Sequence, residues 1–278
     1  MADNKNQAFL SIIIPTLNEA DFLGYLLFSL SRQTYKNFEI IVSDGDSNDQ
    51  TIEIAEKFRT MLPSLKTIIS KKQSPSKQRN QGVKIALYEK LLFLDADVIL
   101  PPNFLEENIK EMAKKKLKLA QPFYLPIGGK ISDQYISIIS RFGIKALRDI
   151  FPVGLGWALF STKTIHNKLN GFDENMQNIC EDGDYIFRAV REGEKFNLLN
   201  SCPGFVSMRR YETKGRIKEV MFSLRAVLLI SLLGKHEAQR FIKRSYGNLL
   251  MVNVEKFLNQ EISKLVKDFT ISLKKHKK

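Results

Sequence analysis

Residues 90–101 read KLLFLDADVILP and place two carboxylates, Asp95 and Asp97, directly after an apolar run. The run at residues 91–94 has the continuous apolar character of a strand that is covered on both faces. A buried charge costs several kcal/mol unless another group pairs with it. We therefore expect the two aspartates either to lie at a solvent-facing strand end or to hold a cation.

The chain before this stretch alternates between strand and helix patterns. Apolar runs predict strands at residues 9–15, 38–44, 66–70 and 91–94, and apolar residues at helical spacing predict helices at 19–31, 51–61 and 76–88. Asn18 and Asp49 are expected to cap the first two helices. Such alternation is typical of a parallel sheet with helices on both faces. The predicted fold class is therefore α/β, with a mostly parallel central sheet flanked by helices.

Polar clusters follow all four predicted strands, at residues 16–19, 44–49, 71–77 and 95–97. In parallel sheets of this class, ligands bind at the carboxyl ends of the strands. We therefore expect these clusters to meet in one binding site. The sequence contains no GxGxxG, GxxxxGK[ST], HExxH or CxxC motif, which disfavours a Rossmann dinucleotide site, a P-loop and a zinc site.

The composition, with 44% apolar and 26% charged residues in 278, is ordinary for a globular protein, which we expect to be cytoplasmic. Two cysteines, Cys180 and Cys202, are too few for a disulfide framework and fit a reducing compartment. Residues 1–8 are polar and carry no signal-peptide pattern. No apolar run is long enough to predict a membrane-spanning helix.

The positive charge is concentrated in the last quarter of the chain. Residues 1–202 hold 26 Lys and Arg against 24 Asp and Glu, whereas residues 203–278 hold 17 against 6. From about residue 215 the sequence predicts amphipathic helices, including the apolar run AVLLISLL at 226–233. A basic amphipathic extension suits an anionic membrane surface, here the inner face of the cell membrane. A solvated basic helix packed on the rest of the chain, or a homodimer contact, remains the alternative.

Four blocks in a fixed order resemble the family 2 glycosyltransferases of the GT-A fold. They are residues 11–51 (SIIIPTLNEADFLGYLLFSLSRQTYKNFEIIVSDGDSNDQT), 77–82 (KQRNQG), the DxD segment 93–98 (FLDADV) and 171–193 (GFDENMQNICEDGDYIFRAVREG). The resemblance implies a GT-A catalytic domain at residues 1–212, with a nucleotide-sugar-binding half at 1–100 and an acceptor half at 101–212. Residues 213–278 are then the C-terminal helical extension.

By this resemblance, the donor is a UDP- or GDP-linked sugar and the activity is hexosyltransferase-like. Asp97 would coordinate Mn²⁺ or Mg²⁺, and Asp95 would hold the ribose or a metal-bound water. A divalent cation neutralises the charge that develops on a leaving nucleoside diphosphate. The residues implied at the nucleotide are Pro15, Thr16, Asn18, Glu19, Asp44, Asp46, Lys77, Arg79, Asn80, Asp95 and Ala96, with Arg209 and Arg210 at the diphosphate.

The segment CEDGDYIFR supplies the implied catalytic pair. In an inverting transfer one carboxylate takes the proton of the acceptor hydroxyl. The resemblance assigns this role to Asp182 and an orienting role to Glu181. The residues alone also permit a simple acidic start of a helix at 181–191, with Asp184 and Arg188 as an i,i+4 pair.

The segment GLGWALFS offers three candidate acceptor contacts, Gly154, Gly156 and Trp157. Glycine lets the backbone approach a sugar closely, and an aromatic face can stack on a pyranose ring. Core filling is the alternative for Trp157. The acceptor is expected to be a glycan, a lipid-linked molecule or a small molecule, in glycan, glycolipid or cell-envelope synthesis.

Two other classes of protein remain as alternatives. A nucleotidyltransferase shares a parallel sheet and an acidic metal site, but TLNE follows the first strand in place of a glycine-rich, lysine-bearing loop. A basic nucleic-acid-binding protein would fit the charge of the last quarter, yet aromatic residues interleaved with arginine are sparse there. We therefore expect no nucleic-acid partner.

Overall fold

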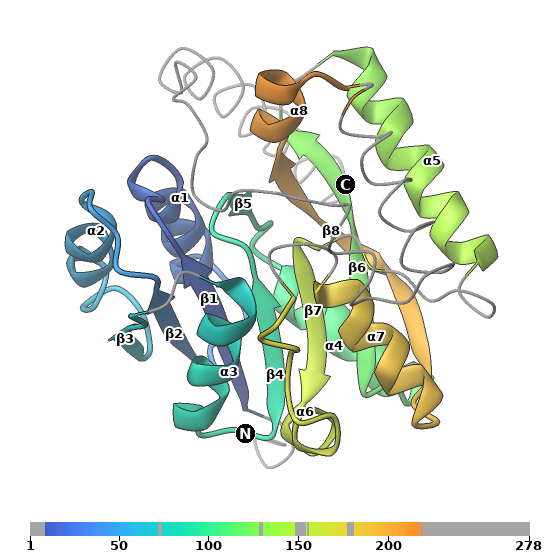
Figure 1. The fold of residues 1–278 in the computed structure, drawn as a ribbon, viewed down its shortest axis with the longest axis horizontal. Helices are drawn as coiled ribbons and strands as arrows, with labels where there is room; N and C mark the ends of the chain where they lie inside the picture. Colours follow the sequence, from blue (N-terminus) through green and yellow to red (C-terminus); the bar gives the residue numbers. More distant parts are fainter. Residues whose placement is uncertain are drawn as a thin grey trace, which may run out of the picture.

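The computed structural model describes residues 9–71, 74–127, 130–147, 154, 156–176, 181–216 and 218. Within them one eight-stranded sheet has the order β3-β2-β1-β4-β7-β6-β8-β5 (Figure 1). The strands are β1 (Leu10–Thr16), β2 (Phe38–Asp44), β3 (Leu65–Ile69), β4 (Lys90–Leu94), β5 (Val98–Ile99), β6 (Leu119–Ile127), β7 (Ala158–Thr162) and β8 (Phe196–Ser207). The helices are α1 (Ala20–Ser31), α2 (Thr51–Lys57), α3 (Pro75–Ile85), α4 (Phe104–Lys115), α5 (Ile131–Leu147), α6 (Lys163–Lys168), α7 (Glu181–Arg191) and α8 (Arg209–Lys214).

The first four strands form the parallel part of the sheet. β1 pairs with β2 and β4, and β2 pairs with β3, all in parallel register. Every residue of β1 and β2 is buried, as their continuous apolar sequences predict. The predicted α/β fold with a mostly parallel sheet is confirmed, because parallel strands continue from one βα unit to the next.

The second half of the sheet is mixed. β7 pairs antiparallel with β4 and β6, β8 runs parallel to β6, and β5 closes the edge antiparallel to β8. Residues 121–170 contribute to β6, α5, β7 and α6. The antiparallel return of β7 places its partner β4, and the aspartates that follow it, near the middle of the sheet.

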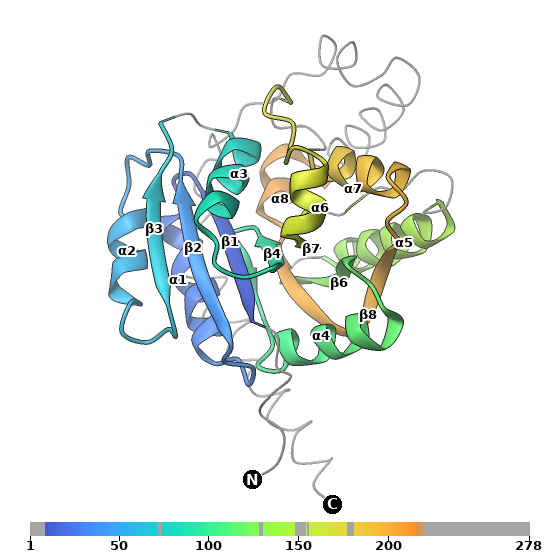
Figure 2. The same cartoon turned by 90° about the horizontal axis from the view of Figure 1, so that it is seen from below.

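Two apolar cores lie on opposite faces of the sheet. Even-numbered β1 residues such as Ile12 pack with apolar residues of α1 and α4, whereas Ile13 packs with residues of α3 and α7. Figure 2 shows α3, α6 and α7 on one side of the sheet and α4 on the other. Burial of both faces keeps the polar groups of the parallel strands to their ends, where a site can form.

The start of α1 corrects one sequence prediction. Asn18 does not cap this helix: the N-cap position is Glu19, and Asn18 has a left-handed φ of 54°. The loop after β2 satisfies the first N–H groups instead, since the Glu19 N–H donates to Thr51 Oγ1 (2.9 Å) and the Ala20 N–H to Asp49 Oδ2 (3.1 Å). Asp49 also accepts from the Thr51 N–H at the start of α2. The two polar loops are therefore fastened to each other.

Helix α8 crosses the boundary predicted between residues 212 and 213. The predicted amphipathic helices beyond residue 218 lie outside the described residues. Among the residues that are described, no helix is long and apolar enough to cross a membrane.

Candidate functional site

The polar loops after β1 and β2 form a hydrogen-bonded group that we call the β1–β2 cradle, made of Thr16, Asn18, Asp44 and Ser47. Asp44 accepts from Thr16 Oγ1, from the Ser47 N–H and from Ser47 Oγ, each at 2.7 Å. The Asn18 N–H donates to Ser47 Oγ, and Asn18 Oδ1 accepts from the Asn48 N–H. Neutral donors thus hold a carboxylate at the carboxyl end of β2.

A second group, the arginine–carboxylate cluster, comprises Glu19, Arg79, Asp95, Asp97, Glu181, Asp182 and Arg209. Arg79 lies on α3 with its side chain only 4% exposed. Its Nη2 is 3.0 Å from Asp95 Oδ1, and its Nη1 is 2.8 Å from Glu181 Oε1. Burial disfavours the charged guanidinium, but the neighbouring carboxylates outweigh this and raise the pKa of Arg79 above its usual value. Arg79 therefore joins the DxD segment to the start of α7.

Arg209, the first residue of α8, holds the other side of the cluster. Its Nη2 lies 2.6 Å from Glu19 Oε1, its Nε lies 3.1 Å from Asp97 Oδ2, and its guanidinium stacks over the Phe22 ring. Burial raises the pKa of Glu19 to about 7; Arg209 opposes this, and Asp97 adds to it. Glu19 Oε2 is buried without a hydrogen-bond partner among the described residues. The raised pKa means that this carboxyl holds a proton more tightly than an exposed glutamate does.

Asp182 lies in the first turn of α7 against a pair of glycines. A Cβ placed on Gly154 would lie 2.8 Å from Asp182 Oδ2 and 2.7 Å from Ile186 Cδ1, and one on Gly156 would lie 3.6 Å from the same oxygen. Burial, followed by the charge of Glu181, raises the pKa of Asp182 to about 6. Arg79 and the N–H groups of the helix start oppose that rise. A carboxylate with a pKa near 6 can accept a proton close to neutral pH.

The acidic residues offer oxygen ligands to a hard cation. In the described part of the chain, no three His, Cys, Asp or Glu side chains form a metal-binding group. Mg²⁺ is commonly held by one or two protein carboxylates together with phosphates and waters. Asp95 and Asp97, which are partly exposed, fit that smaller donor set, and the unpartnered Glu19 Oε2 lies on the same cluster.

Several predicted site residues lie in other positions. Asn80 binds a loop instead of facing the cluster: its Nδ2 donates to Phe172 O and Glu174 Oε1, and its Oδ1 accepts from the Phe172 N–H. The Trp157 ring is 3% exposed and packs on Gly204, where a Cβ would lie 2.4 Å from the ring, so core filling replaces the predicted acceptor contact. Only its backbone reaches the site, since Trp157 O accepts from the Asp95 N–H (2.9 Å).

The other predicted residues lie at the edges of the site. Pro15 is buried near the end of β1, Ala96 is buried in the turn between β4 and β5, Lys77 is half-buried on α3, and Asp46 is exposed with a φ of 67°. The side chain of Arg210 lies outside the described residues, as do residues 153 and 155 around Gly154.

Two cradle contacts were missed in the sequence. Ser47 follows Asp44 at the spacing of an Asx-type turn, so its bonds to Asp44 had a local signal. Gln78 is buried on α3 and donates from Nε2 to Thr16 O (2.6 Å) and Ser43 O (2.7 Å). Its partners lie more than 30 residues away, and nothing local indicates them.

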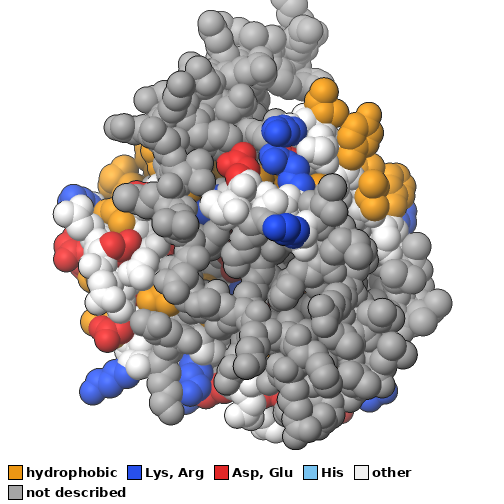
Figure 3. Space-filling view, turned by 45° about the horizontal axis from the view of Figure 1, so that its top comes forward, with side chains coloured by type: hydrophobic (Ala, Val, Ile, Leu, Met, Phe, Trp, Pro, Cys, Tyr) orange, Lys and Arg blue, Asp and Glu red, His pale blue; other side chains and the backbone are white. Residues whose placement is uncertain are grey.

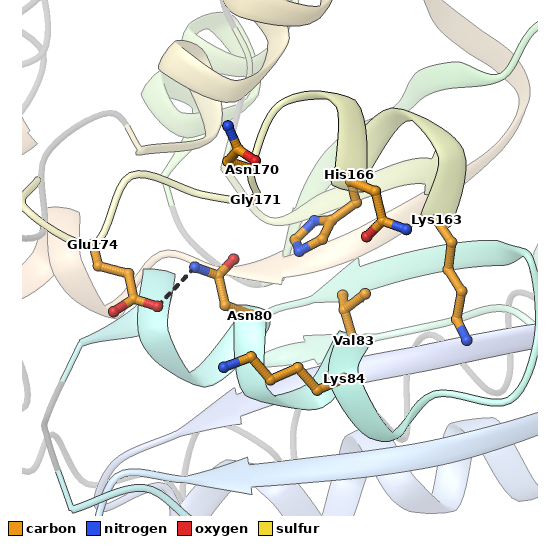
Figure 4. Close-up of a pocket in the computed structure, with 9 residues that line it drawn as sticks. Asn80, Val83, Lys84, Lys163, His166, Asn170, Gly171 and Glu174 are labelled. Atoms are coloured by element: carbon orange, nitrogen blue, oxygen red, sulfur yellow. Dashed lines mark hydrogen bonds between the residues drawn. The ribbon is translucent and has the colours of Figure 1, made fainter.

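A cavity of about 500 Å³ opens between α3 and α6. Figure 4 shows the His166 ring pointing into it, the Asn80–Glu174 hydrogen bond at one end, Lys163 at the other end and Lys84 along the edge below Asn80. Burial lowers the pKa of His166 to about 4, so the imidazole is neutral there. The His166 ring packs against Phe93 and Phe172.

A mixed sheet whose central parallel strands end in an acidic cluster is the architecture of GT-A glycosyltransferases. Residues 11–167, more than half of the chain, match the family described as "Glycosyl transferase family 2". The chain belongs to this family.

Two similar proteins are also named as glycosyltransferases. The poly(ribitol-phosphate) beta-N-acetylglucosaminyltransferase TarS of Staphylococcus aureus is 38% identical over 218 residues, which cover 69% of this chain and 38% of TarS. Glycosyltransferase AglE of Haloferax volcanii is 33% identical over 135 residues, covering 46% of this chain and 44% of AglE. The chain therefore spans less than half the length of these two relatives.

Solved structures share the fold. The crystal structure of S. aureus TarS in complex with UDP-GlcNAc has a TM-score of 0.61 at 23% identity and covers 84% of this chain and 70% of that one. The mannosyltransferase PcManGT from Pyrobaculum calidifontis, in complex with GDP-Man and Mn²⁺, has a TM-score of 0.64 at 17% identity and covers 92% and 71%. At these identities the likeness establishes the fold alone.

Proposed function

We propose that the protein transfers a sugar from a UDP- or GDP-linked donor to a hydroxyl acceptor, with inversion at the anomeric carbon. The observation that carries this proposal is the setting of Asp182, a carboxylate with a raised pKa at the start of α7. Its neighbour Glu181 is joined through Arg79 to Asp95 of the DxD segment. Membership in glycosyl transferase family 2 supports the reaction class. The UDP-GlcNAc and GDP-Man bound by the two structural neighbours support the donor class.

The β1–β2 cradle would bind the nucleoside. Asp44 is already oriented by three donors, so its remaining lone pairs can accept from an N–H of the base without a rearrangement of the loop. Asn18, Asp46 and Lys77 lie on the same loops or on the facing helix and would contact the ribose and base. This preorganisation lowers the entropy cost of binding.

The arginine–carboxylate cluster would bind the diphosphate. Arg79 and Arg209 would exchange part of their carboxylate contacts for phosphate oxygens, to which guanidinium groups bind as planar bidentate donors, and Arg210, the next residue in the chain, would join them at the diphosphate. Asp95 and Asp97 would hold Mn²⁺ or Mg²⁺, and Asp95 would also reach the ribose. A bound divalent cation supplies charge neutralisation for the leaving diphosphate.

Asp182 would act as the general base. It would take the proton of the acceptor hydroxyl while that oxygen attacks the anomeric carbon and the bond from that carbon to the diphosphate oxygen breaks, releasing a nucleoside diphosphate. Glu181, held by Arg79, would position Asp182 and help to keep its pKa high. Gly154 and Gly156 leave open backbone beside the Asp182 carboxylate, where an acceptor sugar would lie.

The acceptor would be a glycan, a lipid-linked molecule or a small molecule, in glycan or cell-envelope synthesis. TarS is named as a poly(ribitol-phosphate) transferase, which supports an acceptor of this kind. We place the catalytic domain at residues 1–212 and propose that the basic extension, residues 213–278, holds the protein at the inner face of the cell membrane or in a homodimer.

Two measurements test this proposal. Calorimetric titration with UDP and with GDP, in Mn²⁺ and after chelation, is expected to show metal-dependent binding of one nucleotide. Asp182→Asn is expected to retain that binding while transfer falls by about 10²–10⁴-fold. Glu192→Gln, a partly exposed acid just beyond the same helix, is the control and should transfer normally. Transfer by the Asp182 variant at the wild-type rate would remove the base assignment.

A further inference from the structure

Helix α5 turns its apolar side chains away from the protein. Five of them, Ile131, Tyr135, Ile138, Ile139 and Phe142, are between 49% and 72% exposed. Their spacing of i, i+4, i+7, i+8 and i+11 puts them in one stripe, which we call the α5 stripe. Figure 3 shows this stripe as a row of hydrophobic side chains along one edge of the molecule.

The inward face of α5 is polar along most of the described helix, and Ile144 near its end packs into the apolar core. Asp133 is fully buried and accepts from Arg216 Nε (2.6 Å) and Nη2 (2.7 Å), and Ser137 Oγ donates to Tyr124 O (2.7 Å) in β6. Arg141 stacks over Phe123 and donates to Asn200 Oδ1. These bonds fix residues 133–141 with their polar side inward, which is the reverse of an ordinary surface helix. The exposed stripe is therefore a built feature of the fold.

Positive charge flanks the stripe. Lys130 and Lys145 are exposed at its two ends. Asp133 is the one acidic residue of α5, and its charge is buried against Arg216. The outward face of the helix thus combines an apolar centre with two cationic ends. A helix of this pattern suits the boundary between lipid headgroups and acyl chains.

Charge complementarity decides which partner covers the stripe. Residues 219–278 carry 12 Lys and Arg against 5 Asp and Glu, so this segment is itself positive. A second copy would bring the same lysines and a net charge of +13. An anionic lipid surface supplies both the apolar layer and the opposite charge. We infer that α5 docks in the plane of an anionic membrane, with the α5 stripe among the acyl chains and Lys130 and Lys145 at the phosphates.

The docked helix would set the position of the site, because both attach to β6. Tyr124 accepts from Ser137 of α5, and Gln121, three residues earlier on β6, has its Oε1 3.2 Å from where a Gly154 Cβ would lie beside Asp182. The inference goes beyond the proposed function and does not depend on it, since membrane binding is measured without donor or acceptor.

Flotation of the full chain with vesicles of equal parts phosphatidylcholine and phosphatidylglycerol tests the inference. Ile139→Ser/Phe142→Ser removes two exposed side chains and is expected to lower the partition coefficient on the order of tenfold or more. Phe28→Ser/Leu87→Ser removes two similarly exposed apolar side chains elsewhere and should bind as the wild type does. Circular dichroism of both variants checks that folding is retained.

Charge and occupancy are tested separately. Lys130→Gln/Lys145→Gln is expected to weaken binding to the anionic vesicles roughly fivefold per lysine and to leave weak binding to pure phosphatidylcholine unchanged. Wild-type binding by the stripe variant would overturn the inference. If that variant also changes the oligomeric state in light scattering, a second copy covers α5 in place of a membrane. If it loses thermal stability while its vesicle binding stays intact, residues 219–278 cover α5.

Discussion

The two halves of the candidate site hold their carboxylates by different means. In the β1–β2 cradle, a hydroxyl, a backbone N–H and a second hydroxyl fix Asp44, and no cation takes part in those three bonds. In the arginine–carboxylate cluster, two guanidiniums hold four carboxylates at 2.6–3.1 Å. In the cradle neutral donors already satisfy the carboxylate, whereas in the cluster a bound ligand can replace one ion pair with another.

The difference separates a part of the site suited to nucleoside binding from a part suited to the reaction. Neutral hydrogen bonds change little when a ligand arrives, so the cradle suits recognition of a nucleoside. Paired charges respond strongly to a new anion or cation, and the cluster also contains the two acids whose pKa values burial raises, Glu19 and Asp182. Perturbed pKa values tend to mark the reacting part of a site.

The largest expected effect breaks the cluster. Arg79→Met leaves Asp95 and Glu181 without their shared cation, and because Arg79 is buried we expect the free energy of unfolding to fall by about 3–5 kcal/mol. Urea denaturation measures this. Arg59→Met, which breaks an exposed pair with Glu56, should leave stability nearly unchanged. Equal losses in the two variants would show that the cluster is no tighter than a surface ion pair.

The next largest effect is expected from a substitution that displaces the Asp182 carboxylate without changing any charge. In Gly154→Ala the new Cβ would meet Asp182 Oδ2 and Ile186 Cδ1 within 2.8 Å, so the carboxylate has to move. We expect transfer to fall by up to about a hundredfold with donor affinity retained. Gly143→Ala, where nothing lies within 4 Å, is the matched control. Equal activity of the two variants would contradict a fixed place for Asp182.

A pH series separates the two halves further. The pKa of Glu19 is raised from 4.5 to about 7, so the folded chain binds this proton more tightly than the unfolded chain. Its contribution to stability is full below pH 4.5 and is lost as the pH rises through about 7, on the order of 3 kcal/mol. Glu19→Gln should therefore flatten the fall in stability across this window. Parallel pH curves for the wild type and the variant would contradict the shift; Glu53→Gln, an exposed acid on α2, is the control.

The smallest expected effect is in the cradle. Thr16→Val removes one donor to Asp44 and leaves both bonds from Ser47, so we expect a loss of about 1.5 kcal/mol in stability. Calorimetry should show weaker nucleotide binding with an unchanged response to Mn²⁺. A change in metal dependence would mean that the cradle and the cluster are not separate.

Local patterns predicted the parts of the fold that repeat a simple period. The βα alternation to residue 94 and the helix Glu181–Arg191 were predicted because a buried run or an apolar stripe marks each element. The helix α5 was not predicted, and its outward apolar stripe could not have been, because packing alone decides which side of a helix is covered. An amphipathic pattern does not state which side is covered.

Long-range contacts limited the prediction of the site. The DxD aspartates, Arg79 and Asp182 were identified by resemblance, and the structure brings them together. That Arg79 joins two of the acids, or that Asn80 holds the Gly171–Glu174 loop, depends on residues 16 to 102 positions apart. Asn18 failed as a cap for the same reason, since Thr51 and Asp49 reach the helix start from another loop.

The packing of Trp157 on Gly204 has an evolutionary consequence. A Cβ at 204 would lie 2.4 Å from the indole, while the carbonyl of Trp157 holds the Asp95 N–H. A larger residue at position 204 therefore requires a smaller side chain at position 157. A substitution at 157 that shifts its backbone would also move Asp95, because the two are joined by one hydrogen bond. Among descendants of this sequence the two positions should change together: a bulky residue at 157 with glycine at 204, or a small residue at 157 with a larger one at 204.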